Sequence, residues 1–267
     1  MANLTLGAVC VALLTCFVGW APSGGSLVVA VPERDHAVLV ADSATTTSQL
    51  VRGSQSACKL VVTARYAIGV TGVTRAGDGS LYDVVGALRS IATEEATVSG
   101  AVSRLLAEQG DAIRFMAVAL NRRADALHLA VLGDAGDDGH SVEERQLLVT
   151  VVSVEMYDSA PRIETRRVFV TLPRSGQQAI ERSRLLATRT QCDGLRCGAF
   201  VAIGHLSAVQ QGFADAPRSA RVSGGLPLAT ALLEAQAKAT PNAVAPPFSA
   251  ARVDAAGARW LTRHKPC

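Results

Sequence analysis

The sequence predicts an α+β fold, a four-layer αββα sandwich in which two packed, mainly antiparallel sheets lie between outer helices. Three observations lead to this prediction. Short aliphatic and β-branched runs come in pairs separated by turn residues, which indicates hairpins. Other stretches repeat apolar residues at helical spacing, and the two patterns alternate along the chain. Of the 267 residues, 49% are hydrophobic and only 18% are charged, so a disordered chain is excluded.

The first 25 residues differ in kind from the rest. Leu6–Trp20 is a nearly unbroken apolar run without a charged residue, and small or turn-forming residues follow it. This length suits the core of a signal peptide and is short for a membrane span, which needs about 20 apolar residues. A buried or membrane-anchoring helix is the alternative, because the usual positive start is missing. We expect residues 1–25 to be a signal peptide that can double as a propeptide, residues 26–267 to form one domain, and the mature protein to be secreted or periplasmic.

The stretch from Gly24 to Gly72 predicts two consecutive hairpins. Its strands are expected at Leu27–Val31, Ala37–Ala41, Leu60–Thr63 and Ala67–Thr71. If the first hairpin is centred on Arg34, Ser26 lies directly across from Asp42, with Cβ atoms about 4.5–5.5 Å apart. A hydroxyl and a carboxylate would then meet at one end of a strand pair.

The remaining chain predicts further elements from the same two patterns. Helices are expected at Leu81–Ala92, Val98–Gln109, Ala179–Thr188, Ser207–Phe213 and Leu226–Ala239. Strands are expected at Phe115–Leu120, Leu127–Leu132, Leu147–Met156, Arg166–Leu172, Ala199–Ile203, Phe248–Asp254 and Ala258–Leu261, with a loop that includes Pro161 between the third and fourth of these strands.

Four cysteines follow the leading segment, namely Cys58, Cys192, Cys197 and Cys267. An even number in an exported chain indicates disulfide bonds, and four cysteines allow three pairings. Cys192 and Cys197 bracket a turn-like spacer and can pair locally, which would leave Cys58 to pair with Cys267. A metal site would need further ligands, and only His205 is near in sequence. We therefore expect no metal, nucleotide or organic cofactor.

The stretch Gly24–Gly72 resembles the β-type subunits of proteasomes and their bacterial relatives, the N-terminal-nucleophile (Ntn) hydrolases. In that family a Gly precedes a nucleophilic Thr or Ser at the head of the first strand, an Ala-Asp-Ser motif ends the second, a Lys opens the third and a Gly ends the fourth. The matching residues here are Gly25-Ser26, Ala41-Asp42-Ser43, Lys59 and Gly72. The spacing from Ser26 to Asp42 fits without a gap, whereas Lys59 sits one residue late and Gly72 one residue closer to it. The resemblance covers about the first quarter of the chain and returns faintly near its end.

This resemblance implies an αββα hydrolase that acts as a threonine/serine-type peptidase on a peptide or small amide. Cleavage after Gly25 would give Ser26 a free α-amine, so that one residue supplies nucleophile and base. Lys59 would help to keep that amine neutral, Asp42 would hold the ammonium in place, and the Gly72 N–H would face the oxyanion. We also expect Lys59→Ala to cost little stability. Nucleic acid is not an expected partner, because the net charge is only +3 and the basic residues are scattered. No membrane is expected as a partner of the mature form, which would be a monomer or a small homo-oligomer.

Several positions depart from the family pattern. Ala44 stands where the family has Arg, and His205 replaces a Ser. Near the end, Asn242 takes the place of an Asp, Ala245 that of a Ser, and Pro246-Pro247 that of paired glycines. Ser43, His205 and Asn242 are therefore auxiliary candidates for the site. The alternative to an enzyme is a catalytically inactive secreted or envelope protein that keeps the sandwich for binding or scaffolding.

Overall fold

The computed structural model describes residues 26–48, 51–76, 82–127, 143–173, 183–204, 206–241, 243–265 and 267. The expected signal peptide at residues 1–25 lies outside this range. The same holds for the auxiliary candidates His205 and Asn242, and for most of the expected strand at Leu127–Leu132.

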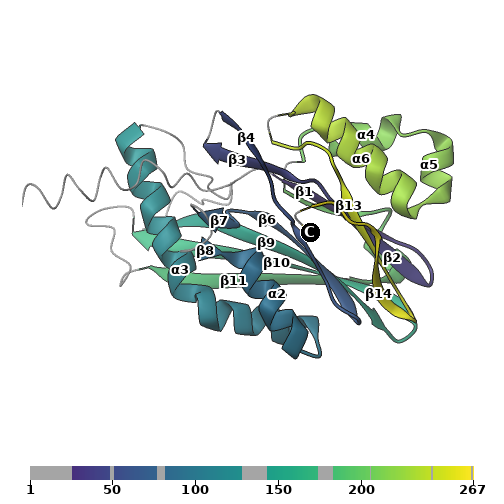
Figure 1. The fold of residues 1–267 in the computed structure, drawn as a ribbon, viewed down its shortest axis with the longest axis horizontal. Coiled ribbons are helices and arrows are strands. Elements are labelled where there is room, and N and C mark those ends of the chain that lie inside the picture. Colours follow the sequence, from purple (N-terminus) through teal and green to yellow (C-terminus); the bar gives the residue numbers. More distant parts are fainter. Residues whose placement is uncertain are drawn as a thin grey trace, which may run out of the picture.

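Two five-stranded antiparallel sheets make up the centre of the fold (Figure 1). In the first sheet the order is β12 (Val201–Gly204), β1 (Leu27–Pro32), β2 (His36–Ala41), β13 (Ser249–Asp254) and β14 (Gly257–Thr262). In the second sheet it is β11 (Arg184–Asp193), β10 (Ala160–Pro173), β9 (Glu143–Tyr157), β6 (Tyr66–Gly72) and β5 (Leu60–Val62). Two short hairpins accompany the sheets, β3 (Ala44–Ser48) with β4 (Val51–Ser56) and β7 (Arg75–Ala76) with β8 (Tyr82–Asp83).

Helices cover the outer face of each sheet, which confirms the predicted four-layer αββα sandwich. Helices α2 (Val84–Glu94) and α3 (Val98–Leu127) pack on the second sheet, and α4 (Val209–Asp215) and α6 (Gly225–Ala239) pack on the first. The short helix α5 (Arg218–Ser223) lies beside α6, and a 3-10 turn, η3 (Gly194–Cys197), follows β11. In Figure 1 the two helical layers lie on opposite sides of the paired sheets.

Each apolar layer is a separate buried cluster, and β1 shows how one strand supplies two of them. Val28 and Ala30 point between the two sheets, whereas Leu27, Val29 and Val31 point toward the helices on the first sheet. Both faces of this strand are covered, so its sequence is continuously apolar instead of alternating with polar residues. Because β1 is buried on both faces, the position of Ser26, which directly precedes the strand, is fixed relative to both sheets.

Part of the expected secondary structure is wrong. Helix α3 runs through Phe115–Leu120, which had been expected as a strand. Ile113, Met116 and Ala117 are buried and continue the helical spacing of the preceding turns, so they pack on the second sheet. A short apolar run is compatible with the helical period as well as with the strand period, and here the preceding helix continues through it.

The expected helix at Ala179–Thr188 is also wrong over its described part, because Arg184–Asp193 form the edge strand β11. Leu185 packs against the helix-side core while Leu186 is exposed, as expected for neighbours on a strand. Most of its other side chains face solvent, so the strand has no apolar alternation to reveal it. The loop expected around Pro161 is likewise a strand, since Pro161 lies opposite Met156 and Asp158-Ser159 make the turn.

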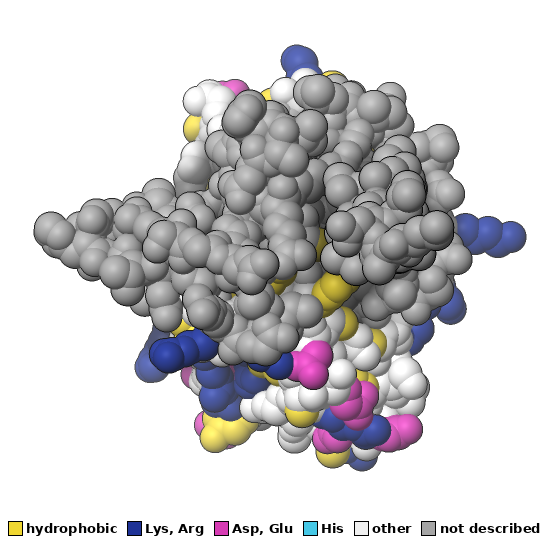
Figure 2. Space-filling model, turned by 90° about the vertical axis from the view of Figure 1, so that its left-hand side faces the viewer, with side chains coloured by type: hydrophobic (Ala, Val, Ile, Leu, Met, Phe, Trp, Pro, Cys, Tyr) yellow, Lys and Arg dark blue, Asp and Glu magenta, His cyan; other side chains and the backbone are white. Residues whose placement is uncertain are grey.

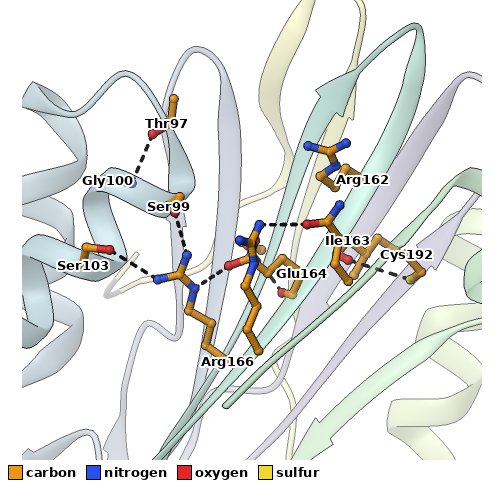
Figure 3. A network of polar contacts seen from close by, with 12 residues as sticks. Thr97, Ser99, Gly100, Ser103, Arg162, Ile163, Glu164, Arg166 and Cys192 are labelled. Carbon is orange, nitrogen blue, oxygen red and sulfur yellow. Dashed lines mark hydrogen bonds and ion pairs between the residues drawn. The ribbon is translucent and has the colours of Figure 1, made fainter. Parts of the chain in front are cut away.

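A charge network centred on the buried Glu164 joins α3 to the second sheet (Figure 3). The carboxylate of Glu164 on β10 accepts hydrogen bonds from Arg166 and from Arg189 on β11. Arg166 in turn donates to the Ser99 hydroxyl at the start of α3, at 2.7 Å. Glu164 itself is only 5% exposed. Because Arg166 binds both Glu164 and Ser99, the network attaches the first turn of α3 to the sheet beneath it.

Candidate active site

The turn between β1 and β2 changes the expected register by one residue. Glu33 N–H donates to the His36 carbonyl at 2.7 Å, so the turn consists of Arg34 and Asp35 and its centre falls between them. The expectation that Ser26 lies directly opposite Asp42 is therefore wrong. Val28 lies opposite Ala41, and continuing that register puts Leu27 opposite Asp42.

Asp42 nevertheless lies next to Ser26, because its side chain reaches back along β1. The Leu27 N–H donates to Asp42 Oδ1 at 2.8 Å, and the Asp42 N–H donates to the Leu27 carbonyl at 3.2 Å. Only the carbonyl carbon of Ser26 separates its Cα from the Leu27 nitrogen, so that Cα lies within roughly 5 Å of Asp42 Oδ1. Ser26 and Asp42 are 3% and 2% exposed.

Lys59 reaches this carboxylate from the other sheet. Its Nζ lies 2.9 Å from both Oδ1 and Oδ2 of Asp42 and also donates to the Ala44 carbonyl. Lys59 directly precedes β5 and is 2% exposed, so the ion pair is fully inside the protein. The burial of both side chains argues against the expectation that Lys59→Ala costs little stability, because breaking a buried pair leaves an uncompensated charge.

Burial dominates the electrostatics of the pair. It lowers the pKa of Lys59, and the charge of Asp42 offsets this only in part. Burial likewise raises the pKa of Asp42, against the opposing effects of Lys59 and of the Leu27 N–H. The three donors of the ammonium face oxygen acceptors and the carboxylate accepts two backbone N–H bonds, a geometry that suits the charged forms of both groups.

Gly72 ends β6 with its N–H directed toward the Lys59 side. Successive N–H groups of a strand point to alternate sides. The Val70 N–H donates to the Lys59 carbonyl at 2.9 Å, and the Val73 N–H donates to Leu148 on the opposite side, so the Gly72 N–H has the direction of Val70. Gly72 has a φ of 97°, and a Cβ there would lie 2.2 Å from the Leu148 carbonyl oxygen. Only glycine fits this position without a backbone shift.

The surroundings of Ser43 complete the described part of the site. Ser43 is buried, its N–H donates to the Ala245 carbonyl at 3.4 Å, and its carbonyl accepts from Ala57 at 3.0 Å. The segment around Ala245, which was aligned with the family's Asp, Ser and glycines, therefore does approach the Asp-Ser motif. Strand β12 ends at Gly204, where an added Cβ would lie 2.0 Å from the Ser26 carbonyl oxygen, so this position requires glycine.

Sequence reasoning missed the contribution of Ala44. Its side chain was noted only as a departure from the family pattern, yet its N–H donates to Asp42 Oδ2 at 3.0 Å and its carbonyl accepts from Lys59. These are backbone contacts that any residue can make. The signal that could have found them is Asp42 itself, since Asp side chains commonly bond the N–H two residues on.

Both disulfide bonds are present in the structure, Cys58–Cys267 and Cys192–Cys197. Cys58 directly precedes Lys59, so the first of them lies beside the ion pair. Within the described residues there is no group of three or more His, Cys, Asp or Glu side chains able to hold a metal ion. None of the helices in the described part of the chain combines the length and apolar character needed to cross a membrane.

No protein-family model matches this sequence, and no curated protein matches it either. Among solved structures the chain is similar to an Anbu (Gly-1) mutant from Hyphomicrobium sp. strain MC1. The two share 12% sequence identity with a TM-score of 0.47, and the match covers 91% of this chain and 89% of that one.

Proposed function

We propose that this protein is an exported N-terminal-nucleophile hydrolase that cleaves a peptide or small amide with Ser26. The observation that carries the proposal is the Asp42 carboxylate, held between the Leu27 N–H at 2.8 Å and the Lys59 ammonium at 2.9 Å beside Ser26. The four-layer sandwich supports it as the scaffold expected for such a site. The two disulfides support export, because such bonds persist in oxidising compartments.

Cleavage between Gly25 and Ser26 activates the site in this proposal. The new α-amine of Ser26, whose ordinary pKa is about 7.7–8.0, accepts the hydroxyl proton as the oxygen attacks the substrate carbonyl. The positive charge of Lys59 favours the neutral amine, and the negative charge of Asp42 stabilises the ammonium once it forms. The Gly72 N–H stabilises the oxyanion, which is worth about 3–4 kcal/mol for a well-placed donor. The ammonium then protonates the leaving amine, and water hydrolyses the ester on Ser26. The enzyme acts as a monomer or a small homo-oligomer.

A second candidate is a non-catalytic binding or scaffolding protein with the same fold. One observation favours it: the carboxylate of Asp42 is fully occupied by two backbone N–H groups and Lys59, as in an ion pair that only stabilises the fold.

Two measurements decide between these candidates. N-terminal sequencing of the exported protein should give a chain that begins at Ser26; a chain that begins at Leu27 or later, or that retains Gly25, has no free-amine nucleophile at Ser26. A hydroxyl-directed β-lactone or epoxyketone should label the protein but not Ser26→Ala, with Ser90→Ala, at an exposed position of α2, as the matched control. Equal labelling of the parent and Ser26→Ala would exclude the enzyme.

A further inference from the structure

Lys59 bridges the two sheets at the site with its backbone and its side chain. Its carbonyl accepts from the Val70 N–H of β6 in the second sheet at 2.9 Å, while its Nζ binds Asp42 at the end of β2 in the first sheet. Strand β5, which follows Lys59, is the edge strand of the second sheet and has only three residues. The position of the ammonium therefore depends on how firmly the start of a short edge strand is held against the opposite sheet.

A covalent bond provides that hold one residue away. Cys58 is bonded to Cys267, whose N–H donates to the His264 carbonyl at 2.8 Å. The His264 N–H donates to the Ser249 hydroxyl at 3.3 Å, and Ser249 lies opposite Ala41 in the first sheet. The disulfide thus attaches the residue before Lys59 to the same end of the first sheet that carries Asp42. Disulfide and ion pair close one ring across the two sheets.

We propose that the Cys58–Cys267 disulfide is a positioning element of the site, which keeps Lys59 paired with Asp42 and out of water. Opening this bond frees the start of β5, admits water to the ammonium and lowers the reactivity of Ser26. The last of these effects rests on the proposed function, whereas the first two concern only Lys59 and the edge strand. The Cys192–Cys197 bond provides a natural contrast, because it closes a loop with a sequence separation of 5 between β11 and η3.

The test measures Lys59 directly. In the exported, processed protein carrying Cys192→Ser and Cys197→Ser, dithiothreitol reduces Cys58–Cys267 to two thiols and becomes a cyclic disulfide itself. Short pulses of an amine-acetylating reagent then report the exposure of Lys59 by peptide mass spectrometry, while circular dichroism follows the fold. Lys238, exposed on α6, is the internal control. Two comparisons need no reductant: the Cys192→Ser/Cys197→Ser protein against the parent reports the loss of Cys192–Cys197 alone, and Cys58→Ser with Cys267→Ser reports the loss of Cys58–Cys267 alone.

We expect reduction of Cys58–Cys267 to raise the acetylation rate of Lys59 at least roughly tenfold before the circular dichroism changes, as a local opening does. The pH dependence of acetylation should also move toward that of an ordinary lysine as the ammonium regains water. The unreduced Cys192→Ser/Cys197→Ser protein should keep the slow Lys59 rate of the parent, whereas the Cys58→Ser/Cys267→Ser protein should show the fast rate without any reductant. Protection of Lys59 that persists in the folded, reduced protein would overturn the proposal. Acetylation that rises only together with unfolding would overturn it as well, since the bond would then have a general stabilising role.

Labelling of Ser26 is followed in the same samples. A protein whose Ser26 never reacts with the β-lactone fails as a hydrolase, yet its Lys59 rates still decide the role of the disulfide. A protein whose Ser26 reacts equally before and after reduction keeps the proposed function and refutes the positioning role.

Discussion

The carboxylate of Asp42 accepts hydrogen bonds from the Leu27 and Ala44 N–H groups as well as from Lys59. With its oxygens occupied in this way, it is badly placed to take a proton from a substrate or from the Ser26 hydroxyl. Its role in the proposed reaction is therefore electrostatic, and the task of general base falls to the α-amine of Ser26. A test of the ion pair therefore has to change Lys59 alone and then Lys59 together with Asp42.

Lys59→Met keeps the length of the side chain and removes its charge. The Asp42 carboxylate then stays buried without its counter-ion, so we expect the free energy of unfolding in urea to fall by about 3–5 kcal/mol and any Ser26-dependent turnover to disappear. Adding Asp42→Asn should restore part of the stability but none of the turnover. Lys238→Met, at an exposed position, should change stability by less than about 0.5 kcal/mol. A loss below about 1 kcal/mol for Lys59→Met would contradict the burial argument.

Gly72→Ala tests the backbone that presents the proposed oxyanion donor. The new Cβ meets the Leu148 carbonyl oxygen and the φ of 97° is unfavourable, so we expect a loss of about 2–4 kcal/mol in the free energy of unfolding. Gly194→Ala is the matched control, because its φ is also positive, at 51°, while its nearest neighbour would lie at an ordinary 3.6 Å. That variant should lose only about 1 kcal/mol. Equal losses would mean that the close approach to Leu148 has no energetic weight.

Among the elements, the four strands around Ser26 and the predicted helix Val98–Gln109 agree with the structure, whereas the second half of α3 and the strand β11 do not. Strands covered on both faces carry continuous apolar runs, and such runs are visible in a sequence. The edge strand β11 buries few side chains, and Phe115–Leu120 fit a helix as well as a strand. The sequences of these two segments therefore do not distinguish a helix from a strand. The meeting of Ser26, Asp42 and Lys59 was predictable from the motif. The one-residue shift was not, because turn length sets the register and Arg34-Asp35 carries no strong turn signal.

The Glu164 network makes a prediction for helix α3. Glu164→Gln leaves the Arg166 guanidinium partly buried without its carboxylate, so the free energy of unfolding should fall by about 2–3 kcal/mol. Hydrogen exchange in the first turns of α3 should accelerate, because Arg166 no longer holds Ser99 firmly. Glu108→Gln, which breaks an exposed pair with Arg104 on the same helix, should cost less than about 1 kcal/mol. Similar losses in the free energy of unfolding for the two variants would show that the Glu164 network stabilises the protein no more than an exposed ion pair does.

For the whole molecule, the two disulfides differ mainly in the length of chain that they enclose. The described surface in Figure 2 carries basic and acidic side chains next to one another with smaller apolar areas between them, in keeping with the net charge of +3.

The stability prediction follows from loop length. Cys58–Cys267 has a sequence separation of 209 and Cys192–Cys197 one of 5. On chain-entropy grounds, replacing the first pair by serines should cost about 5 kcal/mol and the second about 2 kcal/mol. Urea unfolding of the two double variants against the parent measures the difference. A larger loss for the Cys192–Cys197 variant would show that local strain or packing outweighs the enclosed loop.

The strand order of the first sheet has a consequence for biosynthesis. β1 comes first in the described chain, yet its neighbour on one side is β12, and β2 is flanked by β13, which ends at Asp254. Synthesis must therefore pass Gly204 before β1 is paired on both sides, and Asp254 before β2 is. Until then the open edges of these two strands are available for wrong pairing, and in the proposed function Ser26 gains its complete surroundings only late in synthesis.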